Sequence, residues 1–140
     1  MSEPLRLPYT TVSDARGEVD LRPLLSLALS YGDLAIRASG LLDTGADVNV
    51  LPYPLGIQLG IEWENQEPVL PPSGNLSRYE ARGIVVNATV GSFAPVRLAF
   101  AWTRAEQVPL ILGQMNFFLA FEVCFFRLRG LFEIQPNPEA

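Results

Sequence analysis

The fold is decided by residues 40–52, which read GLLDTGADVNVLP. Two leucines end an apolar run that is typical of a buried strand, and a polar loop with a glycine follows at once. An apolar strand that leads directly into such a loop anchors it in the core, so the carboxylate of Asp43 is held rigidly. Thr44 offers a hydroxyl that both donates and accepts, and Gly45 leaves a backbone N–H open to the carboxylate. The segment therefore predicts a functional carboxylate at the end of a strand.

The composition restricts the available chemistry. The 140 residues are 49% hydrophobic and carry a net charge of −5, which fits one globular domain and no broad phosphate-binding face. The chain has no His and no Lys, so a Ser-His-Asp triad, an HExxH zinc site and a Schiff base are all excluded. Cys124 is the single cysteine, which excludes an intrachain disulfide and a multi-thiolate metal site. We therefore expect no cofactor, no metal and no nucleic-acid partner, and carboxylates, tyrosine and water remain for acid–base chemistry.

No secretory signal is evident, so we expect a cytoplasmic protein. Residues 1–20 lack the apolar core of a signal peptide, and one thiol fits a reducing compartment. Val108–Leu128 is long enough to span a bilayer, so a small membrane-associated protein is an alternative. Proline, amide and charged side chains interrupt that stretch and are costly at membrane depth. The segment is therefore interpreted as part of a soluble core, with no membrane partner.

Strand patterns dominate the chain, with short turns between them. The expected strands are Leu5–Val12, Leu21–Ser30, Leu34–Leu42, Val48–Leu51, Ile84–Val90, Val96–Trp102 and Val108–Gly113. A helical turn is expected over Pro52–Leu59, a short helix over Gln114–Phe121 and a terminal hairpin over Glu122–Ile134. Trp63 and Trp102 are interpreted as packing residues, and Cys124 as a small buried apolar residue. The chain is therefore predicted to be all-β with one or two short helices.

Two motifs in this order resemble the retropepsin-like, retroviral-type aspartic proteases. The first is the apolar strand that leads into DTGA (43–46), and the second is PLILG (109–113), an apolar run ending in glycine. In that family the later strand passes under the active loop. The resemblance covers about residues 5–134. It implies a single domain over residues 1–140, a closed β-barrel with a flap hairpin at about 69–84, and one short C-terminal helix.

The resemblance also implies an activity and a partner. An aspartic endopeptidase hydrolyses peptide bonds with two carboxylates that share one proton and bind one water. One copy of this chain has a single Asp-Thr-Gly, so two carboxylates require a homodimer in which Asp43 meets Asp43 of the second copy. The interface would involve the active-site loops and the terminal strands, and a peptide or protein substrate would bind as an added strand. The alternative is a catalytically weak dimeric peptide-binding or scaffolding module on the same fold.

Site residues carry over only where the motifs match. The catalytic residues would be Asp43, Thr44 and Gly45, and Asp47 and Ile111 would bind substrate. Gly74 and Asn75 would also bind substrate, because they lie near the tip of the expected flap, although this tip lacks the glycine-rich sequence of the viral enzymes. A turn or capping role is the alternative for Asp43, and a solvated carboxylate is the alternative for Asp47. In the retroviral relatives an arginine follows the glycine of the closing motif and pairs with the second acid. Here Gln114 occupies that position, so this ion pair is absent.

Overall fold

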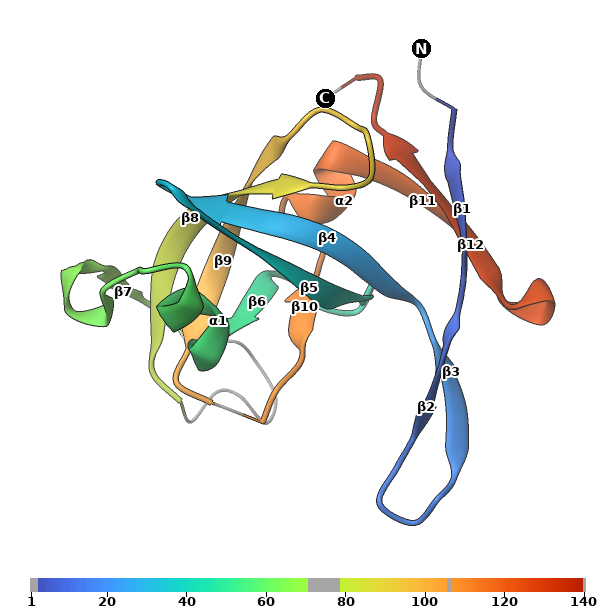
Figure 1. The fold of residues 1–140 in the computed structure, drawn as a ribbon, viewed down its shortest axis with the longest axis horizontal. Coiled ribbons are helices and arrows are strands. Elements are labelled where there is room, and N and C mark those ends of the chain that lie inside the picture. The colour runs from blue at the N-terminus through green and yellow to red at the C-terminus, as the bar shows by residue number, and fades with distance from the viewer. Residues whose placement is uncertain (1–2, 71–78, 106, 140) are drawn as a thin grey trace.

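The computed structural model describes residues 3–70, 79–105 and 107–139 and consists mainly of β-strands (Figure 1). Six of them close into a barrel, because β4 pairs with β5 on one side and with β8 on the other. Around the barrel the order is β4 (Leu24–Tyr31), β5 (Leu34–Leu42), β10 (Leu110–Leu112), β6 (Asn49–Pro52), β9 (Val96–Thr103) and β8 (Ala81–Thr89). The predicted all-β closed barrel is confirmed.

The barrel interior follows from the alternation of side chains along the strands. Leu25, Leu27 and Leu29 of β4 are fully buried, while the residues between them are more exposed. Leu42 and Leu112, at the ends of β5 and β10, belong to the same continuous core. These two strands run parallel, with Leu112 opposite Leu42. The loop that begins at residue 43 is therefore anchored in the core.

A separate three-stranded sheet lies beside the barrel. Its order is β1 (Leu5–Pro8), β12 (Leu131–Pro136) and β11 (Phe121–Phe126). Its inner face is buried through Phe132 and Ile134, both fully buried. The helix α2 (Phe117–Ala120) precedes β11, which confirms the predicted short C-terminal helix, and the turn η3 (Arg127–Arg129) joins β11 to β12. The terminal hairpin is thus where the sequence predicted it.

Three local predictions were wrong. The first run predicted as one strand is divided into β1 and β2 (Thr10–Ser13), because β2 pairs with β3 (Val19–Arg22) in a hairpin that projects away from the barrel (Figure 1). Pro23 then separates β3 from β4, where one continuous strand was expected. Cys124 is exposed rather than buried, because alternation along β11 turns it away from the core.

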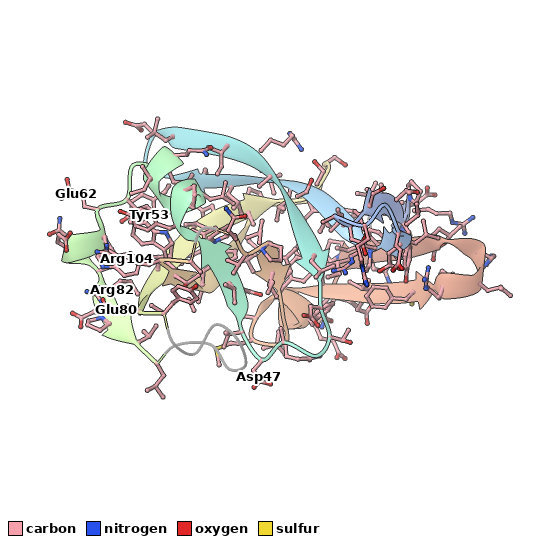
Figure 2. All side chains as sticks on the ribbon, turned by 90° about the horizontal axis from the view of Figure 1, so that it is seen from below. Asp47, Tyr53, Glu62, Glu80, Arg82 and Arg104 are labelled. Atoms are coloured by element: carbon pink, nitrogen blue, oxygen red, sulfur yellow. The ribbon has the colours of Figure 1, made fainter. Side chains whose placement is uncertain are left out.

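An aromatic cluster closes one end of the barrel. It joins the helix α1 (Tyr53–Gln58) and the turn η1 (Trp63–Asn65) to β9. Trp63 and Trp102 are buried, with ring centroids 4.9 Å apart, so both tryptophans are packing residues as predicted. The guanidinium carbons of Arg82 and Arg104 lie 4.8 and 4.7 Å from the centroid of the Trp63 ring. Figure 2 shows these arginines beside Tyr53, apart from Asp47.

The stem of the predicted flap is a β-hairpin. The strand β7 (Glu67–Val69) pairs antiparallel with β8, with Val69 opposite Ala81. Gly74 and Asn75, the predicted tip residues, lie outside the described residues. Within the described ranges, no helix has the length and apolar character needed to cross a bilayer.

Candidate active site

Asp43 follows the last residue of β5 and is fixed by backbone hydrogen bonds. Its N–H donates to the carbonyl of Leu112 at 3.0 Å, which joins the loop to β10. The N–H of Gly45 donates to the Asp43 Oδ1 at 3.0 Å, and the N–H of Ala46 donates to the Asp43 carbonyl at 3.1 Å. The side chain is half-buried, whereas Thr44 and Gly45 are exposed. A carboxylate is thus presented at the surface on a tightly tied loop.

The end of β10 holds the other side of this loop. The N–H of Gln114 donates to the Ala46 carbonyl at 2.8 Å, and the N–H of Met115 donates to the Asp47 carbonyl at 2.8 Å. Gly113 lies so close that a Cβ placed on it would be 2.6 Å from the carbonyl oxygen of Val48 and 2.7 Å from that of Ala46. Glycine is therefore required at this position for the two backbones to meet.

Two asparagines form a buried polar network beneath the loop. Asn49, which is fully buried, accepts a hydrogen bond from the Gly113 N–H at 2.7 Å. Its amide donates to the Ala99 carbonyl at 2.9 Å and to Asn116 Oδ1 at 3.1 Å. Asn116 adopts a φ of 50°, which asparagine tolerates, and its amide donates to the Arg97 carbonyl at 3.3 Å. A buried network whose donors and acceptors have hydrogen-bond partners makes the surrounding backbone rigid.

Sequence reasoning missed this network. One signal was available, because Asn49 is a polar residue within the otherwise apolar run VNVLP (48–52). Its partner Gly113 lies 64 positions further along the chain, and only the fold brings the two together.

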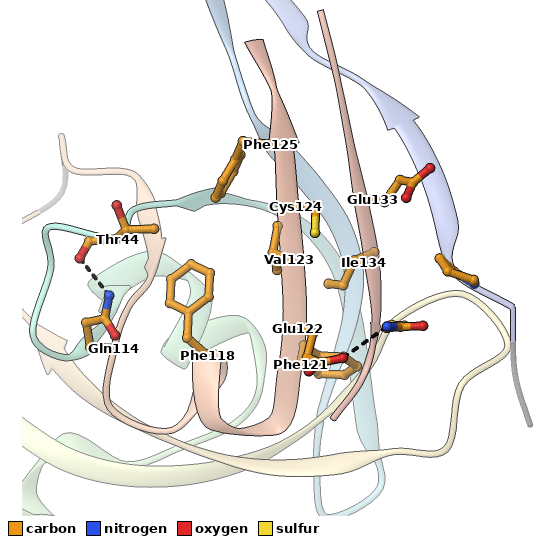
Figure 3. A pocket seen from close by; sticks show the side chains of 12 residues that line it. Thr44, Gln114, Phe118, Phe121, Glu122, Val123, Cys124, Phe125, Glu133 and Ile134 are labelled. Atoms are coloured by element: carbon orange, nitrogen blue, oxygen red, sulfur yellow. Dashed lines mark hydrogen bonds between the residues drawn. The ribbon is translucent and has the colours of Figure 1, made fainter. Parts of the chain in front are cut away.

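Gln114 contacts the loop through its side chain. Its Nε2 donates to the Thr44 carbonyl at 2.8 Å (Figure 3). The Gln114 side chain therefore binds the backbone of the loop. Asp47 is exposed, and within the described part of the chain no arginine lies within 4.0 Å of its carboxylate.

Ile111 is the last predicted substrate-binding residue that the structure describes. Ile111 lies in the middle of β10, half-buried, between Leu41 of β5 and Val50 of β6. Among the residues that the structure describes, no group of three His, Cys, Asp or Glu side chains is placed to hold a metal ion.

An apolar hollow of about 410 Å³ lies next to the loop. Val48 contributes to it from the loop side, and Val69 and Leu70 from the flap stem. Val85 of β8 and Met115 also line its mainly aliphatic wall. These residues are dispersed along the sequence, so the hollow was not predicted.

Comparison with known proteins identifies the fold. No protein-family model matches the chain, and no curated protein matches its sequence. The crystal structure of a retropepsin-like aspartic protease from Rickettsia conorii is similar, with a TM-score of 0.64 and 12% sequence identity. The match covers 94% of this chain and 89% of that chain. The fold is therefore retropepsin-like, as the sequence predicted.

Proposed function

We propose that the chain is an aspartic endopeptidase that acts as a homodimer. The observation that carries the proposal is the position of Asp43, at the end of β5 in a retropepsin-like barrel, with its carboxylate bound by the N–H of Gly45. Each copy supplies one such loop, and a twofold axis between two copies would bring the two carboxylates together.

The reaction follows from two carboxylates that share one proton. The ionised Asp43 takes a proton from the bound water as the water oxygen attacks the peptide carbonyl carbon. The protonated Asp43 of the second copy donates a hydrogen bond to the carbonyl oxygen and stabilises the negative charge that develops there. The C–N bond then breaks, and the leaving nitrogen receives a proton from the dyad. No covalent bond forms between enzyme and substrate. Thr44 of each copy would hydrogen-bond across the axis, and Gly45 would hold the carboxylate.

The substrate would be an extended peptide lying between the flap and the two active loops. The apolar hollow beside Val48 is large enough for an aliphatic side chain next to the scissile bond. Asp47 and Ile111 are proposed to contact the same peptide, as are Gly74 and Asn75.

The test is cleavage of an unfolded protein by wild type and by Asp43→Asn, which keeps the shape and removes the charge. We expect the variant to lose at least about 10²-fold in kcat/KM. Asp33→Asn is the matched control, because Asp33 is exposed in the β4–β5 turn, and it should retain full activity. Equal cleavage by wild type and Asp43→Asn would contradict the proposal. Tight peptide binding without cleavage by either protein would instead favour the peptide-binding module.

A further inference from the structure

Two arginines converge on one tryptophan at the end of the barrel. Arg82 of β8 lies directly opposite Trp102 of β9, so the two side chains share one face of the sheet. Trp63 of η1 packs against Trp102 and receives the Arg82 guanidinium, whose carbon lies 4.8 Å from the Trp63 ring centroid. Arg104, which immediately follows β9, places its guanidinium carbon 4.7 Å from the same centroid. Two positive charges therefore meet on one ring, which attracts each of them.

These two guanidinium groups are short of acceptors. Glu80 Oε2 lies 3.6 Å from Arg82 Nη1, which is an ion pair longer than a hydrogen bond. The Arg82 Nε is buried and has no hydrogen-bond partner among the described residues. In the same part of the chain, no carboxylate lies within 4.0 Å of the Arg104 guanidinium. A buried donor without an acceptor is costly, so the cluster calls for a further negatively charged group.

The neighbouring carboxylates do not supply that group. Glu80 lies beside Arg82 (Figure 2), but its side chain is 69% exposed, so water screens its charge. Glu62 precedes Trp63 in the chain, and its Oε2 accepts a hydrogen bond from Asn65 Nδ2 at 2.7 Å. One screened carboxylate within reach of two guanidinium groups leaves a positive charge unmatched.

We propose that Arg82 and Arg104 bind a compact oxyanion, a phosphate or a carboxylate group, against Trp63. Guanidinium groups recognise both kinds of oxyanion through paired, charge-assisted N–H···O hydrogen bonds. The oxyanion accepts hydrogen bonds from both arginines and offsets the repulsion between them. Arg82 is the fixed half of the site, because its side chain is only 18% exposed, and Arg104 is exposed and able to turn toward the ligand. The site lies on the stem of the predicted flap, where Arg82 is opposite Pro68 of β7.

Tryptophan fluorescence reports this site directly, because both tryptophans of the chain belong to the cluster. Inorganic phosphate, titrated at constant ionic strength with sodium chloride as the balancing salt, should produce a saturable change in emission. A parallel titration with acetate distinguishes the two ligand groups, since the anion with the lower dissociation constant identifies the preferred one. If neither anion produces a saturable change, the proposed site is overturned.

Substitution of either arginine should weaken binding. Arg104→Gln removes one of the two charges, so the dissociation constant of the preferred anion should rise at least about tenfold. Arg82→Gln should raise it to a similar extent, and circular dichroism would verify that the variant keeps its fold. Arg97→Gln is the matched control, because it removes the same charge from an exposed position of β9, opposite Asn87, and should leave the constant unchanged. Equal constants for wild type and Arg104→Gln would contradict the proposal.

Thermal denaturation provides a measurement that does not depend on fluorescence. Phosphate stabilises proteins in general because it is excluded from their surface, so the comparison between variants carries the information. Binding at the two arginines should raise the Tm of wild type and of Arg97→Gln more than that of Arg104→Gln. The same increase in all three proteins would show that the anion acts only as an excluded salt, which would overturn the site. Neither measurement uses cleavage, so failure of this inference would leave the proposed function standing.

Discussion

The side-chain oxygen of Asn49 accepts a hydrogen bond from the backbone N–H of Gly113 at 2.7 Å. This bond joins the strand that leaves the Asp43 loop to the end of the strand that runs beside it. Because Gly113 also lies against the carbonyls of Ala46 and Val48, the position of the loop depends on this contact.

Removing the Asn49 side-chain amide should destabilise the fold. Asn49→Leu has a similar volume but leaves the N–H of Gly113 without its acceptor in a buried position, so we expect the free energy of unfolding to fall by about 1–3 kcal/mol. Urea denaturation measures this loss. The control Asn87→Leu, at an exposed position of β8, should change the free energy of unfolding by less than about 0.5 kcal/mol. Equal changes in the two variants would contradict the role assigned to Asn49.

A side chain at position 113 should displace the loop. The Cβ of Gly113→Ala would meet two backbone oxygens at 2.6 and 2.7 Å, which cannot rotate away, so we expect a loss of about 1–3 kcal/mol in stability and a fall in peptide cleavage. In the control Gly83→Ala the nearest atom is a methyl carbon of Val69 at 3.0 Å, which is able to adjust. Calorimetry and a cleavage assay would compare the two. A milder effect of Gly113→Ala than of Gly83→Ala would show that the contact is unimportant.

The side chain of Gln114 should affect catalysis more than stability. Gln114→Ala removes the exposed hydrogen bond to the Thr44 carbonyl, so the free energy of unfolding should change by less than about 1 kcal/mol. The loop would lose one of its constraints, and we expect kcat to fall about threefold or more. Gln66→Ala is the control, because it removes a comparable hydrogen bond from a glutamine side chain to the Glu62 carbonyl, outside the Asp43 loop. This variant should leave kcat unchanged. Steady-state kinetics of both variants measures this difference. Identical kcat values would show that the Gln114 side chain does not affect catalysis.

The pH dependence of cleavage should be bell-shaped. Two carboxylates that share one proton are competent only while one is ionised and the other protonated, so the rate should decline on both sides of a maximum, on the acidic side of neutrality. Measuring kcat/KM from about pH 4 to 8 tests this expectation. A rate that does not vary over that interval would exclude a shared proton.

The strands and the Asp43 loop were predicted from local patterns, whereas the closed barrel was implied by the resemblance to retropepsin-like proteases. An apolar run marks β4, and an apolar strand running into a polar loop marks the end of β5. The same patterns placed α2 and the terminal hairpin correctly. These signals need no knowledge of distant contacts.

The contacts that hold the site could not be predicted, because the fold alone creates them. Asn49 and Gly113 come from strands far apart in the sequence, as do Thr44 and Gln114. The projecting β2–β3 hairpin was not predicted, because residues 21–30 form one apolar run in the sequence although Pro23 ends one strand and begins another. The exposure of Cys124 was not predicted either, because it follows from the alternation of side chains along β11 and not from the residue type.

The proposed active site needs two Asp43 carboxylates from different copies. Mixing wild-type and Asp43→Asn subunits, allowing them to exchange, and measuring cleavage against the fraction of wild type would show whether it does. If every site needs both carboxylates, an equal mixture should retain about a quarter of the wild-type rate, because only dimers of two wild-type copies act. A rate that falls in simple proportion, to about half, would contradict the account by showing that one Asp43 suffices.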